Sequence, residues 1–322
     1  MKGQCLLIGD IGGTNARFAQ ASIDAPGFHS PLELQVDQFP TAYDAIRHYL
    51  DETGAPPPGA ICLAAAGPVI DDAVNMTNNH WDISVAALTE RLGADAVRLL
   101  NDFEAIAYSI PFLADSDSAA IGPFEDFRLN EGDCNVAILG PGTGLGIAGL
   151  RRRGRLLVPV TGEGGHVGFA PETGLQIELL KVLRGKFDRV SRERFVAGSG
   201  LPDVYEALAV VRGKSVTPLS AAEIFAETAS NSVAAETVDL FFEMLGQVAG
   251  DLALTLGALD GVFVAGGIAK RYPEILESSR FRAAFENKGR YRPMMERIAT
   301  RLILHDQPGL LGAAYVAREL AS

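Results

Sequence analysis

The chain of 322 residues has few cysteines, no excess of positive charge and no long hydrophobic run, and each shortage excludes a class of protein. Its three cysteines, Cys5, Cys62 and Cys134, are odd in number and widely spaced, so we interpret them as reduced thiols of a cytosolic protein, not as a disulfide framework. The 28 Lys and Arg residues against 40 Asp and Glu give a net charge of −12, which argues against nucleic-acid binding. A single nucleotide is still compatible with this charge, because backbone dipoles and one metal ion are enough to hold it.

The shortage of long apolar runs also bears on location. No stretch approaches the ~18 apolar residues that a transmembrane helix needs. The apolar segment 4–8 near the N-terminus is interrupted by Asp10 and is too short for a signal peptide. We therefore expect a cytoplasmic protein with no membrane association, and at about 150 residues per domain the length predicts two domains.

Two parts of the chain share the order strand, glycine-rich turn, strand. Apolar residues on either side of Gly9–Asn15 predict a β-hairpin, and segments 135–139 and 145–150 predict a second one around Gly140–Gly144. The arginine-rich run 151–155 is interpreted as the tip of a further hairpin that leads into a strand at 156–160. The repeated order predicts a duplicated α/β unit.

Apolar runs and helical spacing predict the other elements. We expect a stiff surface loop at 55–59, strands at 61–65, 96–100, 262–265 and 301–305, and helices at 40–50, 85–92, from Phe103 onward and at 310–320. The single tryptophan, Trp81, is interpreted as a core side chain.

The first glycine-rich turn is a candidate phosphate site. Glycines let the backbone approach phosphate oxygens, and consecutive N–H groups form an anion-binding concavity. Asp10 stands at the expected end of the strand, where a carboxylate can hold a magnesium ion through its waters. The alternative is a plain hairpin turn with an exposed Asp.

Two later glycine-rich turns are further candidates. The first is Gly140–Gly146, whose four alternating glycines can also simply make a tight strand crossing. Gly144–Gly149 formally fits a dinucleotide fingerprint, but such a fingerprint opens a helix and this segment continues as a strand. A Walker A loop is absent, because Leu208 stands where the first glycine before Gly213-Lys214-Ser215 would be required. Gly266-Gly267 follows a strand and can admit an adenosine, or it can be a simple turn into a helix.

Polar residues elsewhere suit a hydroxyl-bearing substrate. Asp102 follows a strand, where a carboxylate can take the proton of an attacking hydroxyl, although it can also be a helix N-cap. Glu163 and His166 lie in a glycine-rich segment and offer hydrogen bonds to several hydroxyl groups. A metal site is the competing interpretation of this pair, and Glu193 on its own indicates only a surface helix charge.

Several segments taken together resemble the bacterial glucokinase family, in the family's order and over nearly the whole chain. They are Gly9–Arg17, Leu100–Phe103, Gly142–Gly146, Gly162–His166, Val264–Ile268, Phe281–Arg290 and Pro308–Gly312. The zinc-binding cysteine cluster of the related repressor-and-kinase family is missing. Gly140-Pro141 departs from the pair that many relatives have, which concerns the local loop shape.

The resemblance implies an actin-like, ribonuclease-H-like α/β fold in two domains around a cleft, 1–112 with a returning helix at about 306–322, and 113–305. It implies that ATP phosphorylates the 6-hydroxyl of glucose, with Asp102 as general base and with Mg²⁺ held near Asp10, through water. Glucose hydroxyls would be bound by Asn101, Asp102, Glu163, His166 and Glu193. ATP would be bound by Gly9, Asp10, Ile11, Gly12, Gly13, Thr14, Gly142, Thr143, Gly144, Gly266 and Gly267.

The expected partners are glucose and ATP, with no nucleic acid and no membrane, and the expected assembly is a homodimer. Three alternatives stay open at this point. The first is another hexose kinase of the same fold. An actin-like filament former or chaperone ATPase would share the phosphate loops but lack Gly162–His166. A non-catalytic sugar sensor would call for a DNA-binding extension, whereas the first strand here begins by residue 5.

Overall fold

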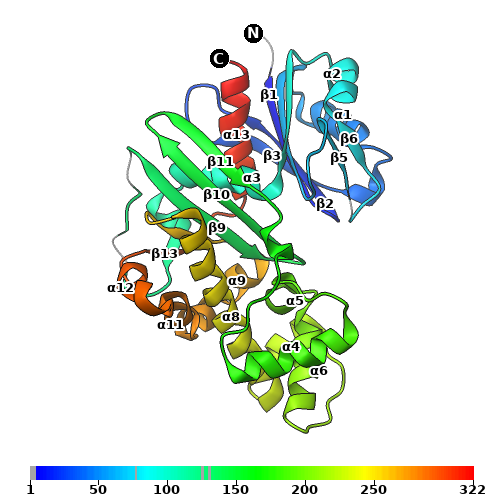
Figure 1. Cartoon of the computed structure of the whole chain (residues 1–322). Helices are drawn as coiled ribbons and strands as arrows, with labels where there is room; N and C mark the ends of the chain where they lie inside the picture. The colour runs from blue at the N-terminus through cyan, green and yellow to red at the C-terminus, as the bar shows by residue number, and fades with distance from the viewer. Residues whose placement is uncertain (1–4, 77, 125–126, 130–131) are drawn as a thin grey trace. The chain divides into compact units, whose positions relative to one another are not determined.

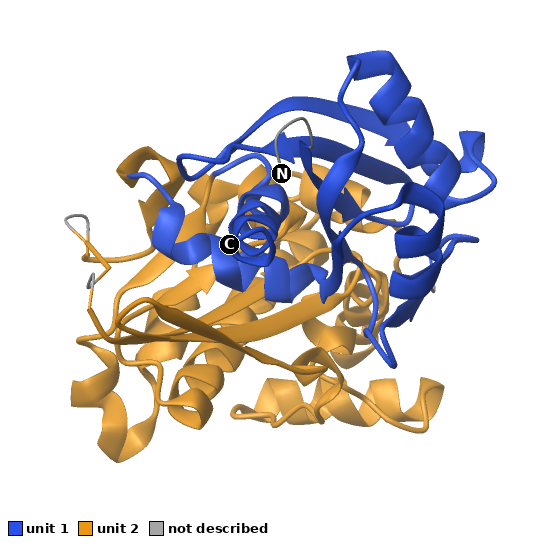
Figure 2. Ribbon diagram, turned by 90° about the horizontal axis from the view of Figure 1, so that it is seen from above, with its two compact units in different colours: residues 1–114, 305–322 blue, residues 115–304 orange. Residues whose placement is uncertain are grey.

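The computed structural model describes residues 5–76, 78–124, 127–129 and 132–322. The chain forms two compact units, which Figure 2 shows in two colours. Unit 1 contains residues 1–114 and 305–322, and unit 2 contains residues 115–304. Gln4, where the first apolar segment was expected to begin, lies outside the described residues. No helix in the described ranges is long and apolar enough to cross a membrane.

Unit 1 is built on a five-stranded sheet with the order β3-β2-β1-β4-β7. β1 (Cys5–Ile11), β2 (Asn15–Ala21) and β3 (Phe28–Gln35) are antiparallel neighbours, which confirms the first predicted hairpin. β4 (Pro58–Ala65) and β7 (Ala96–Asn101) continue the sheet in parallel with β1. The carboxyl ends of β1, β4 and β7 therefore share one edge of the sheet.

The helices of unit 1 begin where capping side chains occur in the sequence. Thr41 caps α1 (Ala42–Thr53), Ser84 caps α2 (Val85–Leu92) and Asn101 caps α3 (Asp102–Ser109). The chain returns to this unit for α13 (Pro308–Leu320), which contacts β1, β2, β4 and α3 (Figure 1). A short two-stranded sheet pairs β5 (Ala73–Asn75) with β6 (Asp82–Ser84).

Unit 2 repeats this plan. Its sheet has the order β11-β10-β9-β12-β13-β8. β9 (Cys134–Pro141), β10 (Leu145–Arg153) and β11 (Leu156–Thr161) are antiparallel, and β12 (Val262–Val264) and β13 (Thr300–Ile303) run parallel to β9. β8 (Ser118–Ala120) adds an antiparallel edge. The shared arrangement confirms the predicted duplicated α/β unit and the ribonuclease-H-like fold class.

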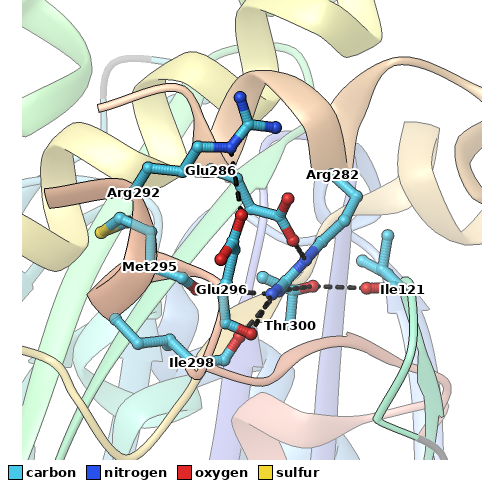
Figure 3. Close-up of polar contacts among 8 residues, drawn as sticks. All are labelled: Ile121, Arg282, Glu286, Arg292, Met295, Glu296, Ile298 and Thr300. Carbon is cyan, nitrogen blue, oxygen red and sulfur yellow. Dashed lines mark hydrogen bonds and ion pairs between the residues drawn. The ribbon is translucent and has the colours of Figure 1, made fainter. Parts of the chain in front are cut away.

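Most of the helices lie in unit 2, where the central α8 (Ser232–Leu256) buries residues on much of its surface. The others are α4 (Gly174–Lys186), α5 (Glu193–Val196), α6 (Leu201–Val211), α7 (Ala221–Ala226), α9 (Gly267–Arg271), α10 (Pro273–Ser278), α11 (Phe281–Glu286) and α12 (Arg292–Met295). A partly buried arginine, Arg282, fixes α11 to the start of β13 and to the residues before it. It donates to the carbonyl of Ile298 at 2.7 Å and to the hydroxyl of Thr300 at 3.1 Å (Figure 3).

Several predicted boundaries were wrong. β4 begins at Pro58, inside the expected surface loop, because proline is tolerated as the first residue of a strand. β9 continues through Gly140-Pro141, which pair with β10. The arginines 151–153 belong to β10, since Arg151 and Arg152 pair with both β9 and β11 and Arg153 pairs with β11. The hairpin tip is only Gly154-Arg155, and β13 ends at Ile303 rather than at His305.

The three cysteines are free and buried, which confirms their interpretation as unpaired thiols. Burial raises the pKa of the Cys5 thiol to about 11, so this group stays protonated at neutral pH and is a poor nucleophile. Trp81 is 1% exposed and is a core side chain, as the sequence indicated.

Candidate active site

The predicted phosphate turn of unit 1 is a short loop between β1 and β2. The N–H of Gly12 donates to the carbonyl of Asn15 at 2.9 Å and closes the turn. The side-chain amide of Asn79 donates to the carbonyl of Gly12 at 2.9 Å and fixes it from outside the sheet. Thr14 is exposed at its tip. Sequence reasoning did not identify Asn79, although it lies in a polar run just before Trp81.

Asp10 lies within β1 rather than at its end, because the strand continues to Ile11. It is paired in register with Arg17 on β2 and with Ala64 on β4. Burial raises the pKa of the Asp10 carboxyl, and the positive charge of Arg17 partly opposes this effect. The carboxylate also lies beside the first turn of α13, next to Gly309.

Asn101 and Asp102 divide two roles between them at the start of α3. Asn101 is the N-cap: its Oδ1 accepts from the N–H of Phe103 at 2.9 Å, and its Nδ2 donates to the carbonyl of Gly67 at 3.1 Å. Asp102 is the first residue of the helix, and its Oδ1 accepts from the same N–H at 2.9 Å. Asp102 is partly buried, and both side chains therefore accept from the same free N–H at the start of the helix.

The strand register places Asp10 and Asn101 near one edge. β4 lies between β1 and β7, with Ala64 opposite Asp10 and Ala65 opposite Asn101. Carboxyl ends of parallel strands are where open α/β sheets bind their ligands. The unit 1 candidates thus share the edge at which a substrate is expected.

The second glycine turn lies in unit 2, between β9 and β10. The N–H of Gly142 donates to the carbonyl of Gly144 at 2.8 Å, and the carbonyls of Gly142 and Thr143 accept from Gly198 and Ser199. Gly266 follows the neighbouring strand β12 in a left-handed conformation with φ +90°, and a Cβ there would lie 2.6 Å from the carbonyl oxygen of Pro141. Because β12 and β9 are parallel neighbours, the two glycine segments lie side by side.

Glu193 is not a simple surface charge. It is the first residue of α5, and its Oε2 accepts from the backbone N–H of Leu145 at 2.9 Å, directly after the glycine turn. A Cβ on Gly144 would lie 2.5 Å from the same oxygen, so only glycine admits the carboxylate here. The family resemblance implies that Glu193 is a site residue. The structure places its carboxylate beside the Gly142–Gly144 turn.

Glu163 and His166 frame the single turn η4 (Gly164–His166), which follows β11. Both side chains are exposed. Gly165 packs directly against the backbone of Leu145, the residue that also donates to Glu193. Within unit 2 the structure thus brings Glu163, His166, Glu193 and the glycine turn together around the start of β10. In the described part of the chain, no group of three or more His, Cys, Asp or Glu residues is arranged to hold a metal ion.

Comparison with known proteins decides the family. The glucokinase family model matches residues 7–320. The chain belongs to the glucokinase family. A glucokinase of Caulobacter sp. strain K31 is 42% identical over 96% of this chain and 93% of the relative. The crystal structure of a glucokinase from an Antarctic psychrotroph has a TM-score of 0.88 at 35% identity and covers 97% of this chain and 98% of that one.

A third similarity concerns the fold alone. A glucokinase from Balamuthia mandrillaris, solved in complex with glucose, has a TM-score of 0.79 at 23% identity and covers 98% of this chain and 94% of that one. The family membership confirms the activity expected from the sequence: the protein is an ATP-dependent sugar kinase with glucokinase function.

Proposed function

We propose that the chain transfers the γ-phosphoryl group of ATP to the 6-hydroxyl of glucose, with Asp102 as the general base. The observation that carries this assignment is the division of roles at α3. Asn101 is the N-cap of the helix, and Asp102 follows it as a partly buried residue at the carboxyl edge of a parallel sheet. A carboxylate in such a place can accept the proton of the attacking hydroxyl.

The acceptor sugar is held by the residues that flank this base and by the cluster in unit 2. Asn101 uses one N–H and one lone pair on the protein, which leaves a second of each for a hydroxyl group. Glu163 and His166 are exposed, and Glu193 holds one oxygen on Leu145, so its other oxygen can accept from the sugar. Together they supply the mixture of donors and acceptors that a polyhydroxylated substrate needs.

The donor nucleotide is held by the three glycine segments, Gly9–Thr14, Gly142–Gly144 and Gly266-Gly267. Backbone N–H groups of these segments suit phosphate oxygens, except those of Gly12 and Gly142, which close their own turns. The hydroxyls of Thr14 and Thr143 add further donors. One carboxylate next to the phosphates fits a magnesium ion, which usually keeps several waters and takes its other ligands from the nucleotide. We therefore assign Asp10 as the residue that holds Mg²⁺ through water, where the ion would neutralise phosphate charge during transfer.

Two further expectations accompany this function. We take units 1 and 2 as the two domains of the protein. Three free cysteines are consistent with a cytoplasmic location. The homodimer stays a prediction, which light scattering coupled to size exclusion tests.

A coupled assay with a panel of hexoses and phosphoryl donors tests the proposal. The expected result is the highest kcat/KM with glucose and ATP, dependence on Mg²⁺, and glucose 6-phosphate as the product identified by NMR. Preference for another hexose would assign a different kinase of the same fold. Nucleotide hydrolysis without any sugar product would refute a kinase and support a nucleotide-driven binding protein.

A further inference from the structure

A buried lysine lies behind the sugar-recognition residues of unit 2. Lys288 follows α11, which packs along α8 where α8 carries Gly246 and Gly250. A Cβ on Gly250 would lie 2.6 Å from Cε of Lys288 and 2.6 Å from the carbonyl oxygen of Phe285. Glycine at this point of α8 therefore gives the lysine stem its path into the protein.

The ammonium group of Lys288 joins two carboxylates from distant segments. Its Nζ lies 2.7 Å from Oε1 of Glu172 and 2.9 Å from Oδ1 of Asp251, and only 5% of its side chain is exposed. Asp251 in turn pairs with Arg192, with 3.6 Å between Oδ2 and the guanidinium. Two cations and two anions balance in this cluster, so removal of one leaves a poorly solvated charge without its partner.

Each end of the cluster leads to a segment that carries a proposed sugar contact. Arg192 directly precedes Glu193, and its backbone N–H donates to the carbonyl of Val167, next to His166, at 2.9 Å. Glu172 lies six residues beyond His166 on the same loop, and its N–H donates to the side chain of Gln176 at 2.7 Å. The rings of Phe169 and Phe195 also stack between the two segments, with centroids 4.0 Å apart.

We propose that Lys288 is a positioning residue for sugar recognition: it holds the Glu163–Glu172 loop and the Arg192-Glu193 segment in register, and so sets the spacing between His166 and Glu193. The proposal rests on the proposed function, because it assumes that these two side chains contact glucose. Lys288 itself contacts no substrate. Substitution of Lys288 should therefore raise the KM for glucose and leave the KM for ATP and the proton transfer largely unchanged.

Steady-state kinetics of Lys288→Met test the proposal. Methionine keeps the length and most of the volume of the stem but removes the charge. We expect the KM for glucose to rise roughly tenfold or more, because small displacements of positioned groups cost this much. The KM for ATP should stay within about twofold. Lys181→Met, which removes an exposed lysine from an ion pair in the same unit, is the matched control and should match the parent protein.

A second variant covers the case in which Lys288→Met does not fold. Asp251→Asn leaves Lys288 paired with Glu172 but disconnects Arg192, and it should raise the KM for glucose in the same way. Where both single variants fold, their effects on the KM for glucose in a double-mutant cycle should be clearly less than additive, because both act through the same ion-pair cluster. Full additivity would show that the two residues act separately and would overturn the proposal.

Two other outcomes also contradict it. Equal increases in both KM values, or a lowered Tm with unchanged kinetics below that Tm, would show that Lys288 only stabilises the fold.

Glu193→Gln separates this failure from a failure of the proposed function. If Glu193→Gln leaves the KM for glucose unchanged, the sugar assignment itself is wrong; if Glu193→Gln is impaired while Lys288→Met is normal, only the positioning role is refuted.

Discussion

Gly309 and Asp10 are in contact: a Cβ built on Gly309 would lie 2.9 Å from Oδ2 of Asp10. The first residues of the chain and the start of its last helix thus meet at one carboxylate. Because the helix N-terminus carries partial positive charge, the first turn of α13 is a favourable neighbour for a carboxylate. The glycine in the Pro308–Gly312 segment is therefore explained by the space that Asp10 occupies.

Gly309→Ala should disturb the proposed magnesium site. The added methyl group must displace either the carboxylate or the first turn of α13, and a misplacement of about 1 Å near a reaction can cost up to 10²-fold in rate. We expect kcat to fall and the Mg²⁺ concentration needed for half-maximal activity to rise, measured by the coupled assay with magnesium titration. Gly185→Ala on α4 is the control, since a Cβ there meets nothing within 4 Å. A Gly309→Ala enzyme with normal magnesium dependence would remove Asp10 from the metal site.

Asp102→Asn should separate proton transfer from sugar binding. The amide keeps the shape and still accepts a hydrogen bond from the N–H of Phe103, but it cannot take a proton. General-base contributions are typically about 10²–10⁴-fold, and we expect a loss in kcat in the upper part of this range. Glucose affinity, measured by calorimetry, should persist. Asp95→Asn, at an exposed position in the same unit, is the control. Near-normal turnover in Asp102→Asn would exclude the general-base role.

The sequence predicted the starts of α2 and α3 well, because neighbouring residues in the chain determine where these helices begin. Ser84 and Asn101 are capping residues placed just before apolar spacing of helical period, so α2 and α3 begin at or next to the predicted residues. The strand bounds at Pro58 and Pro141 were wrong because hydrogen bonds from neighbouring strands, not local propensity, extend β4 and β9.

The non-local contacts around the candidate site residues could not be predicted from the sequence. Glu172, Asp251 and Lys288 each look like ordinary surface charges in the sequence, and only the packing of α11 on the glycines of α8 brings them together. The contact between Asn79 and Gly12 is likewise non-local. Glu193 was found only through the family resemblance, because its partner is a backbone N–H that no side-chain pattern reveals.

Glu163→Gln and His166→Ala should each weaken glucose recognition. Both side chains are exposed on the loop that packs against Leu145, where they can contact the sugar. A polar group of the substrate left without its partner costs about 1–3 kcal/mol, so kcat/KM for glucose should fall at least roughly tenfold. The KM for ATP should change little. An effect confined to ATP would reassign residues 162–166 to the nucleotide.

Asp10→Asn should make the protein more stable at neutral pH while it impairs activity. Burial raises the pKa of Asp10 in the folded state, so the folded protein binds its proton more tightly than the unfolded chain does. The contribution of the Asp10 carboxyl to the free energy of unfolding is therefore present at low pH and is lost as the pH rises through the folded-state pKa. Removal of the charge should raise Tm more at about pH 7.5 than at about pH 4.5, measured by calorimetry. An equal shift at both pH values in Asp10→Asn would contradict the assignment.

Trp81 should report on the phosphate turn through its intrinsic fluorescence. Its indole N–H donates to the carbonyl of Phe39 at 3.0 Å, and its backbone N–H donates to Oδ1 of Asn79 at 2.8 Å. The side chain of Asn79 also donates to the carbonyl of Gly12. A ligand that shifts the Gly12 turn should therefore move Asn79 and change the surroundings of the indole. We expect a saturable change with a non-hydrolysable ATP analogue whose midpoint agrees with calorimetry. Asn79→Ala should reduce the amplitude far more than the affinity. A flat signal with the analogue, together with a strong signal in glucose alone, would show that the indole responds to the sugar side of unit 1, and the connection through Asn79 would then be refuted.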